Sequence, residues 1–195
     1  MLAGAVEGDV DQRVLERLVA EAGGELYAVF GREGKAALRE SIRGYNNDAR
    51  LRPWVVLVDL DDDFDCAPPL VSTWLPKPAR LMRLRVAVRE IEAWLLADRE
   101  RIASFLGVPV SRIPLNPDEV AEPKRFLVSL AQGSRRKRIR EDMVPRPGSG
   151  RSVGYLYNSR LYEFIAKFWR ADRASERSES LRRCRASIAQ LVAER

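Results

Sequence analysis

An uncharged apolar run at residues 54–58 constrains the fold of this chain more than any other feature. Three of its five residues are valines, and a short run of this kind is typical of a strand buried on both faces of a parallel sheet. Strands of such a sheet are joined by crossover helices, which cover both faces. We therefore expect an α/β protein with a mainly parallel sheet flanked by helices.

Strand-like and helix-like patterns alternate around this run. A first helix follows Asp9 or Asp11, either of which is a suitable cap, and ends at Gly23-Gly24. A second helix begins after Lys35 and ends near Arg43, before a loop at residues 44–48. A proline-containing connection is expected around residues 67–69. The strands expected in this half of the chain are residues 3–6, 26–30, 54–58 and 81–88.

From Glu90 onward the pattern becomes helical. One helix or two short ones are expected between residues 90 and 107, and a flexible loop is expected at residues 145–150. Further helices are expected at residues 124–130, 161–169 and 180–192. We therefore expect an α/β core at residues 1–98 and a mostly helical extension at residues 99–195, packed on the core.

Composition narrows the available chemistry. The 195 residues contain no histidine, which excludes histidine-based nucleophilic sites and histidine-ligated zinc. Cys66 and Cys184 are far apart and form no CxxC motif, so a thiolate zinc site is excluded and a reduced, cytoplasmic setting is favoured. The remaining catalytic groups are carboxylates, lysine, arginine and hard metal ions such as Mg²⁺ or Mn²⁺.

Two acidic clusters follow expected strands. Glu7 and Asp11 come after the first strand, and Asp59 and Asp61 come after the apolar run. Ligands of open α/β sheets gather at the carboxyl ends of the strands, and a divalent metal relieves the repulsion between neighbouring carboxylates. Taken alone, Glu7 and Asp11 are explained by helix capping, but together with Asp59 and Asp61 at the end of a neighbouring strand they favour a metal site. Other aspartates of the second cluster are interpreted as solvated loop charges: Asp62, Asp63 and Asp65.

A net charge of +6 beside these acidic clusters suits a polyanionic substrate. Lys35 follows a glycine-containing turn that lacks the full phosphate-loop spacing, so we expect it to touch a nucleic-acid backbone rather than ATP. No apolar run has the length of about 20 residues that a membrane span needs. The strongest basic patch, interpreted as a phosphate contact, is Arg135, Arg136, Lys137, Arg138 and Arg140.

Four large aromatic residues of the second half are interpreted as core or interface residues rather than as stacking platforms for bases. They are Trp94, Tyr155, Tyr157 and Trp169. A role for Tyr155 or Tyr157 as a covalent nucleophile has little support in the sequence.

The order of a strand, a Glu-Gly turn, a helix and a later strand ending in Asp-x-Asp resembles the Toprim domain. The resemblance implies a Rossmann-like fold in which Glu7, Asp59 and Asp61 bind Mg²⁺ or Mn²⁺ for phosphoryl transfer. Toprim nucleases, including the overcoming-lysogenization-defect nucleases, often carry a further acid that Asp11 matches. The long acidic run leaves open which of Asp61 and its neighbours Asp62, Asp63 and Asp65 contact metal.

Later segments resemble a narrower group, the small bacterial Toprim-like proteins found beside AAA or ABC-type ATPases in defence cassettes. These segments are residues 89–98, 123–125 and 178–181. Within them, Glu92 is interpreted as an extra metal ligand in preference to Glu90, with a surface salt bridge as the alternative. Lys124 is a candidate for stabilising charge on the scissile phosphate; a solvated lysine is the alternative.

The leading hypothesis is a metal-dependent nuclease of a defence-type system, with DNA favoured over RNA and an ATPase as partner. The alternative is a non-catalytic subunit that binds nucleic acid or docks on an ATPase. A haloacid-dehalogenase-like phosphatase is disfavoured because its nucleophilic aspartate follows the first strand, where this chain has Glu7. A nucleotide-sugar transferase is disfavoured because the region before Asp59 is too short for its nucleotide-binding half.

Overall fold

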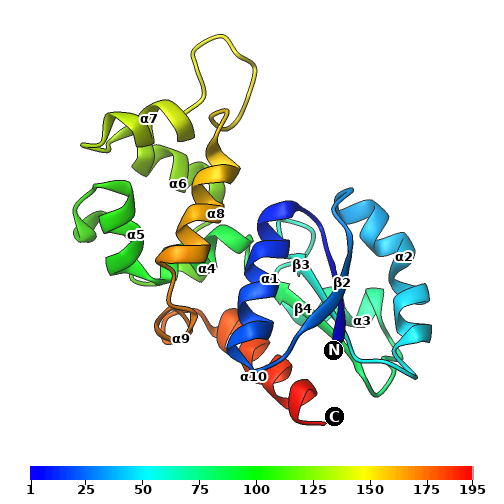
Figure 1. The fold of residues 1–195 in the computed structure, drawn as a ribbon. Coiled ribbons are helices and arrows are strands. Elements are labelled where there is room, and N and C mark those ends of the chain that lie inside the picture. The colour runs from blue at the N-terminus through cyan, green and yellow to red at the C-terminus, as the bar shows by residue number, and fades with distance from the viewer. Residues whose placement is uncertain (195) are drawn as a thin grey trace. The chain divides into compact units, whose positions relative to one another are not determined.

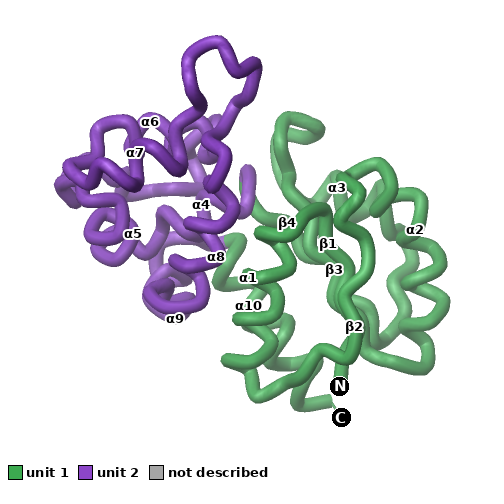
Figure 2. The backbone as a smooth tube through the Cα atoms, turned by 45° about the horizontal axis from the view of Figure 1, so that its top comes forward, with its two compact units in different colours: residues 1–88, 180–195 green, residues 89–179 purple. Residues whose placement is uncertain are grey.

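The computed structural model describes residues 1–194, and the chain forms two compact units (Figure 2). Unit 1 contains residues 1–88 and the chain from Ser180 onward, and unit 2 contains residues 89–179. A division after Asp98 was expected. The compact units instead divide after Val88, and the C-terminal helix belongs with the sheet.

Unit 1 is built on a four-stranded parallel sheet with the strand order β2-β1-β3-β4 (Figure 1). Every residue of β1 and β3, the two central strands, is buried. The strands are β1 (Leu2–Val6), β2 (Leu26–Gly31), β3 (Trp54–Asp59) and β4 (Met82–Ala87). The predicted α/β fold with a parallel sheet and flanking helices is therefore confirmed, with the apolar run in a central strand.

Four helices complete unit 1, namely α1 (Asp9–Glu21), α2 (Lys35–Asp48), α3 (Ala67–Trp74) and α10 (Glu179–Ala193). Helix α1 packs closely on β1, since a Cβ atom at Gly4 would lie 2.8 Å from Leu15 Cδ2. The predicted side-chain cap of α1 is wrong. Gly8 is the N-cap residue, and Asp9 and Asp11 lie in the first turn, where the helix dipole stabilises negative charge.

Two further local predictions are wrong. The expected loop at residues 44–48 is the last part of α2, because Tyr45 stacks on Trp54 with ring centroids 4.6 Å apart and so holds the chain in the helix. The expected connection around Pro68 and Pro69 is the start of α3. Proline is accepted there because the first helical N–H groups have no partner within the helix.

Unit 2 is wholly helical. Its elements are α4 (Ile91–Ala97), α5 (Arg99–Leu106), the 3₁₀ turns η1 (Val110–Arg112) and η2 (Pro117–Glu119), α6 (Pro123–Gln132), α7 (Lys137–Met143), α8 (Tyr157–Lys167) and α9 (Ala171–Ala174). Helix α4 is buried along its whole length and is the central helix of the unit. Helix α5 ends at Gly107, which has a φ of 70°, so the prediction of two short helices ending there is confirmed.

Three of the four aromatic residues discussed above lie in the core of unit 2, as predicted: Trp94, Tyr157 and Trp169. The fourth, Tyr155, has 82% of its surface exposed. Among residues 1–194, no helix is both long enough and apolar enough to cross a membrane.

Candidate metal and phosphoryl-transfer site

Glu7 and Asp59 meet at the carboxyl edge of the sheet in unit 1. Glu7 directly follows β1, and Asp59 is the last residue of the neighbouring strand β3. The backbone N–H of Asp59 donates a hydrogen bond of 2.7 Å to Glu7 Oε1. The structure therefore brings together the first members of the two acidic clusters, which are 52 residues apart in sequence.

The turn after β2 fixes the backbone at Glu7. The N–H of Gly34 donates to the Glu7 carbonyl at 3.1 Å, and the N–H of Arg32 donates to the Val6 carbonyl at 2.9 Å. Gly31 has a φ of 84°, and a Cβ atom there would lie 2.3 Å from the Val6 oxygen. Only glycine allows this close approach, so the turn holds Glu7 at the sheet edge.

Lys35, the first residue of α2, binds the acidic loop that follows β3. Its Nζ lies 2.8 Å from Asp61 Oδ2, 2.8 Å from Asp63 Oδ2 and 3.1 Å from the Leu60 carbonyl oxygen. Asp61 has a φ of 50°, in the left-handed region that aspartate tolerates better than most residues. Asp63, expected to be a solvated loop charge, remains half exposed while it contacts Lys35, and the expected contact of Lys35 with nucleic acid stays a prediction.

Burial dominates the electrostatics of Glu7. It raises the pKa of this carboxyl to about 7, against the hydrogen bond from Asp59 and the charge of Lys35, which lower it. The charges of Asp61 and Asp63 raise it further. Burial lowers the pKa of Lys35, but the hydrogen bonds to Asp61 and Asp63 outweigh burial and raise it overall. Glu7 is therefore half protonated near neutral pH, and a bound cation would favour its ionised form.

Asp11 is buried in the first turn of α1, and its Oδ2 lies 3.2 Å from the position of a Cβ atom on Gly8, next to Glu7. The donor set of Glu7, Asp11, Asp59 and Asp61 consists of carboxylate oxygens, which suit Mg²⁺ or Mn²⁺. As the side chains stand, no group of three or more acidic or thiol residues in positions 1–194 surrounds a common point. The four residues thus suit a hard cation by the chemistry of their donor atoms, and Glu7 and Asp59 also lie together at the edge of the sheet.

A second cluster of carboxylates and a lysine lies within unit 2. Lys124, near the start of α6, donates its backbone N–H to Glu90 Oε2 at 2.7 Å. Its Nζ lies 3.8 Å from Glu90 Oε1 and 3.6 Å from Glu92 Oε1. The hydroxyl of Tyr157 donates to Glu92 Oε1 at 3.2 Å. The two candidates Glu92 and Lys124 therefore lie together, and they are joined by Glu90 and Tyr157, which the sequence favoured less as functional residues.

Glu92 is a buried acid with only 1% of its surface exposed. Burial raises its pKa, the charge of Lys124 lowers it and the charge of Glu90 raises it. Its Oε2 accepts no hydrogen bond from the residues that the structure describes. Burial and the nearby Glu92 also hold the pKa of Tyr157 well above its usual value. The Tyr157 hydroxyl is therefore protonated and directed at Glu92, which disfavours it as a nucleophile.

The basic run lies at the start of α7 in unit 2. The exposed members are Arg135, Arg136, Lys137 and Arg138. Arg140 is half-buried, and its guanidinium donates to the Ser134 carbonyl, so it also fixes the turn before the helix. The exposed side chains present positive charge to solvent.

Comparisons of the chain with family models, with curated proteins and with solved structures gave no match. The side-chain geometry and the sequence motifs therefore carry the functional argument.

Proposed function

We propose that this protein is a Toprim-like nuclease that depends on Mg²⁺ or Mn²⁺ and hydrolyses phosphodiester bonds, in DNA rather than RNA. The observation that carries the proposal is the meeting of Glu7 and Asp59 at the carboxyl edge of two central parallel strands. Open α/β sheets bind their ligands at this edge. A bacterial defence system with an AAA or ABC-type ATPase partner is the setting that the resemblance implies.

Each of the candidate residues in unit 1 would have a distinct role. Glu7, Asp11, Asp59 and Asp61 would hold the metal, which supplies a Lewis acid and lowers the pKa of an attacking water. Lys35 keeps the loop after β3 in place through Asp61 and Asp63. Gly31 and the turn after it set the position of Glu7.

The proposal also assigns roles to the two candidates in unit 2. Considered within that unit alone, Lys124 would bind a phosphate group and Glu92 would serve as a metal ligand. Within unit 2 these side chains face each other at 3.6 Å, so each one sets the electrostatic environment of the other.

The test is nicking of supercoiled plasmid in Mg²⁺ and in Mn²⁺ by the wild type and by two double variants. Asp59→Asn with Asp61→Asn removes two proposed ligands, and activity should fall at least about 100-fold, as for loss of a main electrostatic group in catalysis. Asp62→Asn with Asp65→Asn is the matched control. It removes the same charge from exposed positions of the same loop and should leave nicking unchanged. Equal activity in both double variants would refute the proposed metal site.

One observation favours the alternative, a subunit that binds nucleic acid or docks on an ATPase without catalysis. Lys35 already neutralises Asp61 and Asp63 at 2.8 Å, so the acidic loop is held without a metal ion. This alternative predicts no nicking with either metal, and nucleic-acid binding that a chelator leaves unchanged. Calorimetric titration with Mn²⁺ separates the two functions. A nuclease must bind Mn²⁺, and the Asp59→Asn/Asp61→Asn variant should lose that binding, whereas the alternative requires no Mn²⁺ binding.

A further inference from the structure

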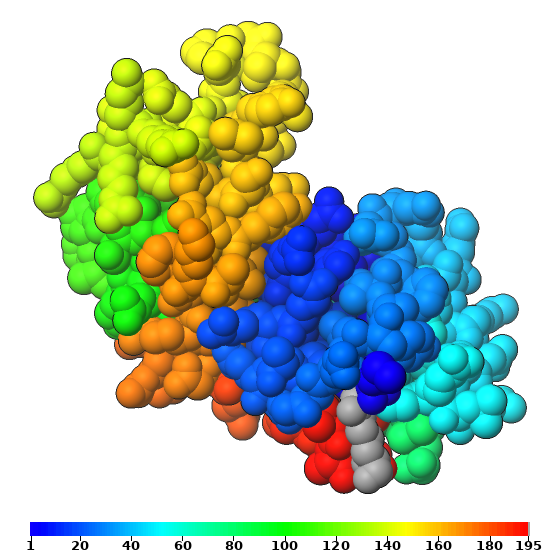
Figure 3. Space-filling model, viewed as in Figure 1, coloured from blue at the N-terminus to red at the C-terminus, as the bar shows by residue number. Residues whose placement is uncertain are grey.

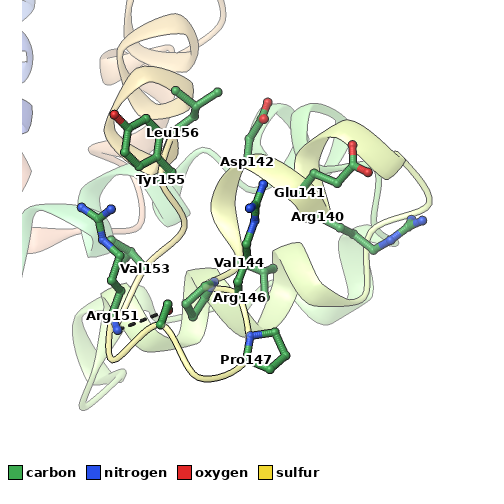
Figure 4. A pocket seen from close by; sticks show the side chains of 12 residues that line it. Arg140, Glu141, Asp142, Val144, Arg146, Pro147, Arg151, Val153, Tyr155 and Leu156 are labelled. Atoms are coloured by element: carbon green, nitrogen blue, oxygen red, sulfur yellow. Dashed lines mark hydrogen bonds between the residues drawn. The ribbon is translucent and has the colours of Figure 1, made fainter.

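A pocket with a volume of about 850 Å³ lies in unit 2, at the loop between α7 and α8 (Figure 4). Its volume is in the range of sites for small ligands. Arg146 and Val144 line one limb of the loop, and Val153 and Tyr155 line the other (Figure 4). The whole loop stands at the surface of the molecule, where it is coloured yellow in Figure 3. None of the acidic residues discussed above contributes to this pocket.

The lining of the pocket is positively charged in effect. Its two acids are neutralised from outside it, because Arg160 Nε donates to Asp142 Oδ2 at 2.7 Å and Lys137 lies 3.6 Å from Glu141. The guanidinium of Arg146 forms no hydrogen bond or ion pair with any residue in the described part of the chain, and Arg146 is exposed. The arginines that line the pocket are Arg140, Arg146 and Arg151.

The pocket also presents an aromatic ring to solvent. Tyr155 has 82% of its surface exposed, and the neighbouring Leu156 has 41% exposed. The guanidinium carbon of Arg151 lies 5.3 Å from the centre of the Tyr155 ring, in a cation–π arrangement. An exposed ring beside arginines is the combination with which proteins stack an unpaired base and contact its phosphates.

We propose that this pocket binds single-stranded nucleic acid, with a base stacked on Tyr155 and phosphates held by Arg146 and Arg151. The inference rests on the proposed function in taking nucleic acid as the substrate, and adds the form of that substrate. A single strand is favoured over a duplex because duplex bases are already stacked and paired, whereas an open strand offers a free base face to the ring. Arg140 is the member of the basic run that also lines the pocket.

The test is fluorescence anisotropy with a labelled oligodeoxythymidine of about 15 nucleotides, in EDTA so that no cutting takes place. Tyr155→Ala should weaken binding about 5- to 100-fold, which is the range of base stacking on one aromatic side chain. Tyr155→Phe keeps the ring and should bind like the wild type. Arg146→Ala should lower the slope of log K against log salt by about 0.7, the value for one phosphate contact on a single strand.

Arg101→Ala is the matched control for Arg146→Ala, because Arg101 is also an exposed arginine of unit 2 and lies outside the pocket. It should leave the affinity within about twofold of the wild type. Tyr155, Arg146 and Arg151 are all exposed, so their variants should keep the wild-type melting temperature, which circular dichroism checks.

Several outcomes would overturn the inference. They are equal binding by the wild type and Tyr155→Ala, tighter binding to the duplex than to the single strand, and displacement of the oligonucleotide by polyglutamate at equal charge. The proposed function fails separately. Binding that depends on the pocket, together with no metal-dependent nicking, would keep this inference and remove the nuclease. Nicking that depends on Asp59 and Asp61, together with oligonucleotide binding that does not depend on Tyr155, would do the reverse.

Discussion

Each unit of this protein holds a lysine against two carboxylates, but the two clusters differ in burial. In unit 1, Lys35 has 18% of its side chain exposed, and its partners Asp61 and Asp63 have 44% and 52% exposed. In unit 2 the pattern is reversed, because Lys124 has 42% of its side chain exposed and its partner Glu92 only 1%. The exposed members are therefore the acids in unit 1 and the lysine in unit 2.

This difference separates two uses of the same residue types. Exposed carboxylates around a half-buried lysine are open to a cation or a substrate from solvent. The attraction between these carboxylates and the lysine contributes little to stability. A buried carboxylate depends on its neighbours for all of its stabilisation. We therefore expect the unit 1 cluster to be adjustable without loss of the fold, and the unit 2 cluster to be sensitive to any change.

The largest effect we predict concerns Glu7. Its folded-state pKa of about 7 lies above the ordinary value of 4.5, so the unfolded chain binds fewer protons between these values. Stability contributed by the protonated carboxyl is therefore full below about pH 4.5 and is lost as the pH rises to about 7. The loss should amount to about 2 to 3 kcal/mol. Urea unfolding in EDTA from pH 5 to 8 measures it.

Glu7→Gln should remove this pH dependence, since the amide does not titrate. Glu33→Gln is the matched control, because Glu33 is exposed and its change should leave the slope of the free energy of unfolding against pH in place. A slope that persists in Glu7→Gln would show that another group causes it. Mn²⁺ should stabilise the wild type more at pH 8 than at pH 6, because the ion competes with the proton on Glu7.

The next effect concerns the buried cluster. Lys124→Met removes the cation nearest to Glu92, and the free energy of unfolding should fall by about 2 kcal/mol, less than for a fully buried pair because Lys124 is partly exposed. Lys137→Met is the matched control, since 80% of the Lys137 side chain is exposed and its loss should cost less than about 0.5 kcal/mol. Equal costs in urea unfolding would contradict the distinction between the clusters.

Burial in the sheet made the fold of unit 1 predictable. The run at residues 54–58, which forms most of β3, contains only apolar residues, and a strand buried on both faces favours this composition. The meeting of Glu7 and Asp59 followed from the same argument, because parallel strands place their carboxyl ends at one edge. Gly44 and Asn46 have low helix propensity, which by itself favours a loop at residues 44–48. The stacking of Tyr45 on Trp54 joins α2 to β3 and outweighs that propensity.

The partners within each cluster were not predictable in the same way. The contact of Asp63 with Lys35 depends on the left-handed backbone at Asp61, which no local pattern indicates. In unit 2, Tyr157 is 65 residues from Glu92, and only the packing of α8 brings them together. No periodicity in the sequence identifies such a pair, because both residues lie on separate helices that each have their own buried face. Tyr155, two residues before Tyr157, is exposed because it lies in the loop that precedes α8, and the sequence does not indicate this difference either.

A smaller effect is expected at Tyr157. Tyr157→Phe keeps the packing of the ring but leaves Glu92 Oε1 without the hydroxyl donor, so stability should fall by about 1 kcal/mol. The same change made in a Glu92→Met background should cost less, because the acceptor is gone. A double-mutant cycle in urea measures this difference. A coupling energy near zero would mean that the hydroxyl contributes nothing to holding Glu92.

The smallest effect on stability should come from Lys35, and it completes the comparison. Lys35→Met removes the cation that pairs with Asp61 and Asp63, but water solvates these exposed carboxylates. The free energy of unfolding should therefore change by less than about 1 kcal/mol. Cation affinity should rise instead, because a positive charge leaves the acidic edge. Calorimetric titration with Mn²⁺ should show tighter binding than in Lys77→Met, which removes an exposed lysine elsewhere in unit 1. A loss of stability as large as that of Lys124→Met, with unchanged Mn²⁺ affinity, would mean that Lys35 serves the fold rather than the acidic edge.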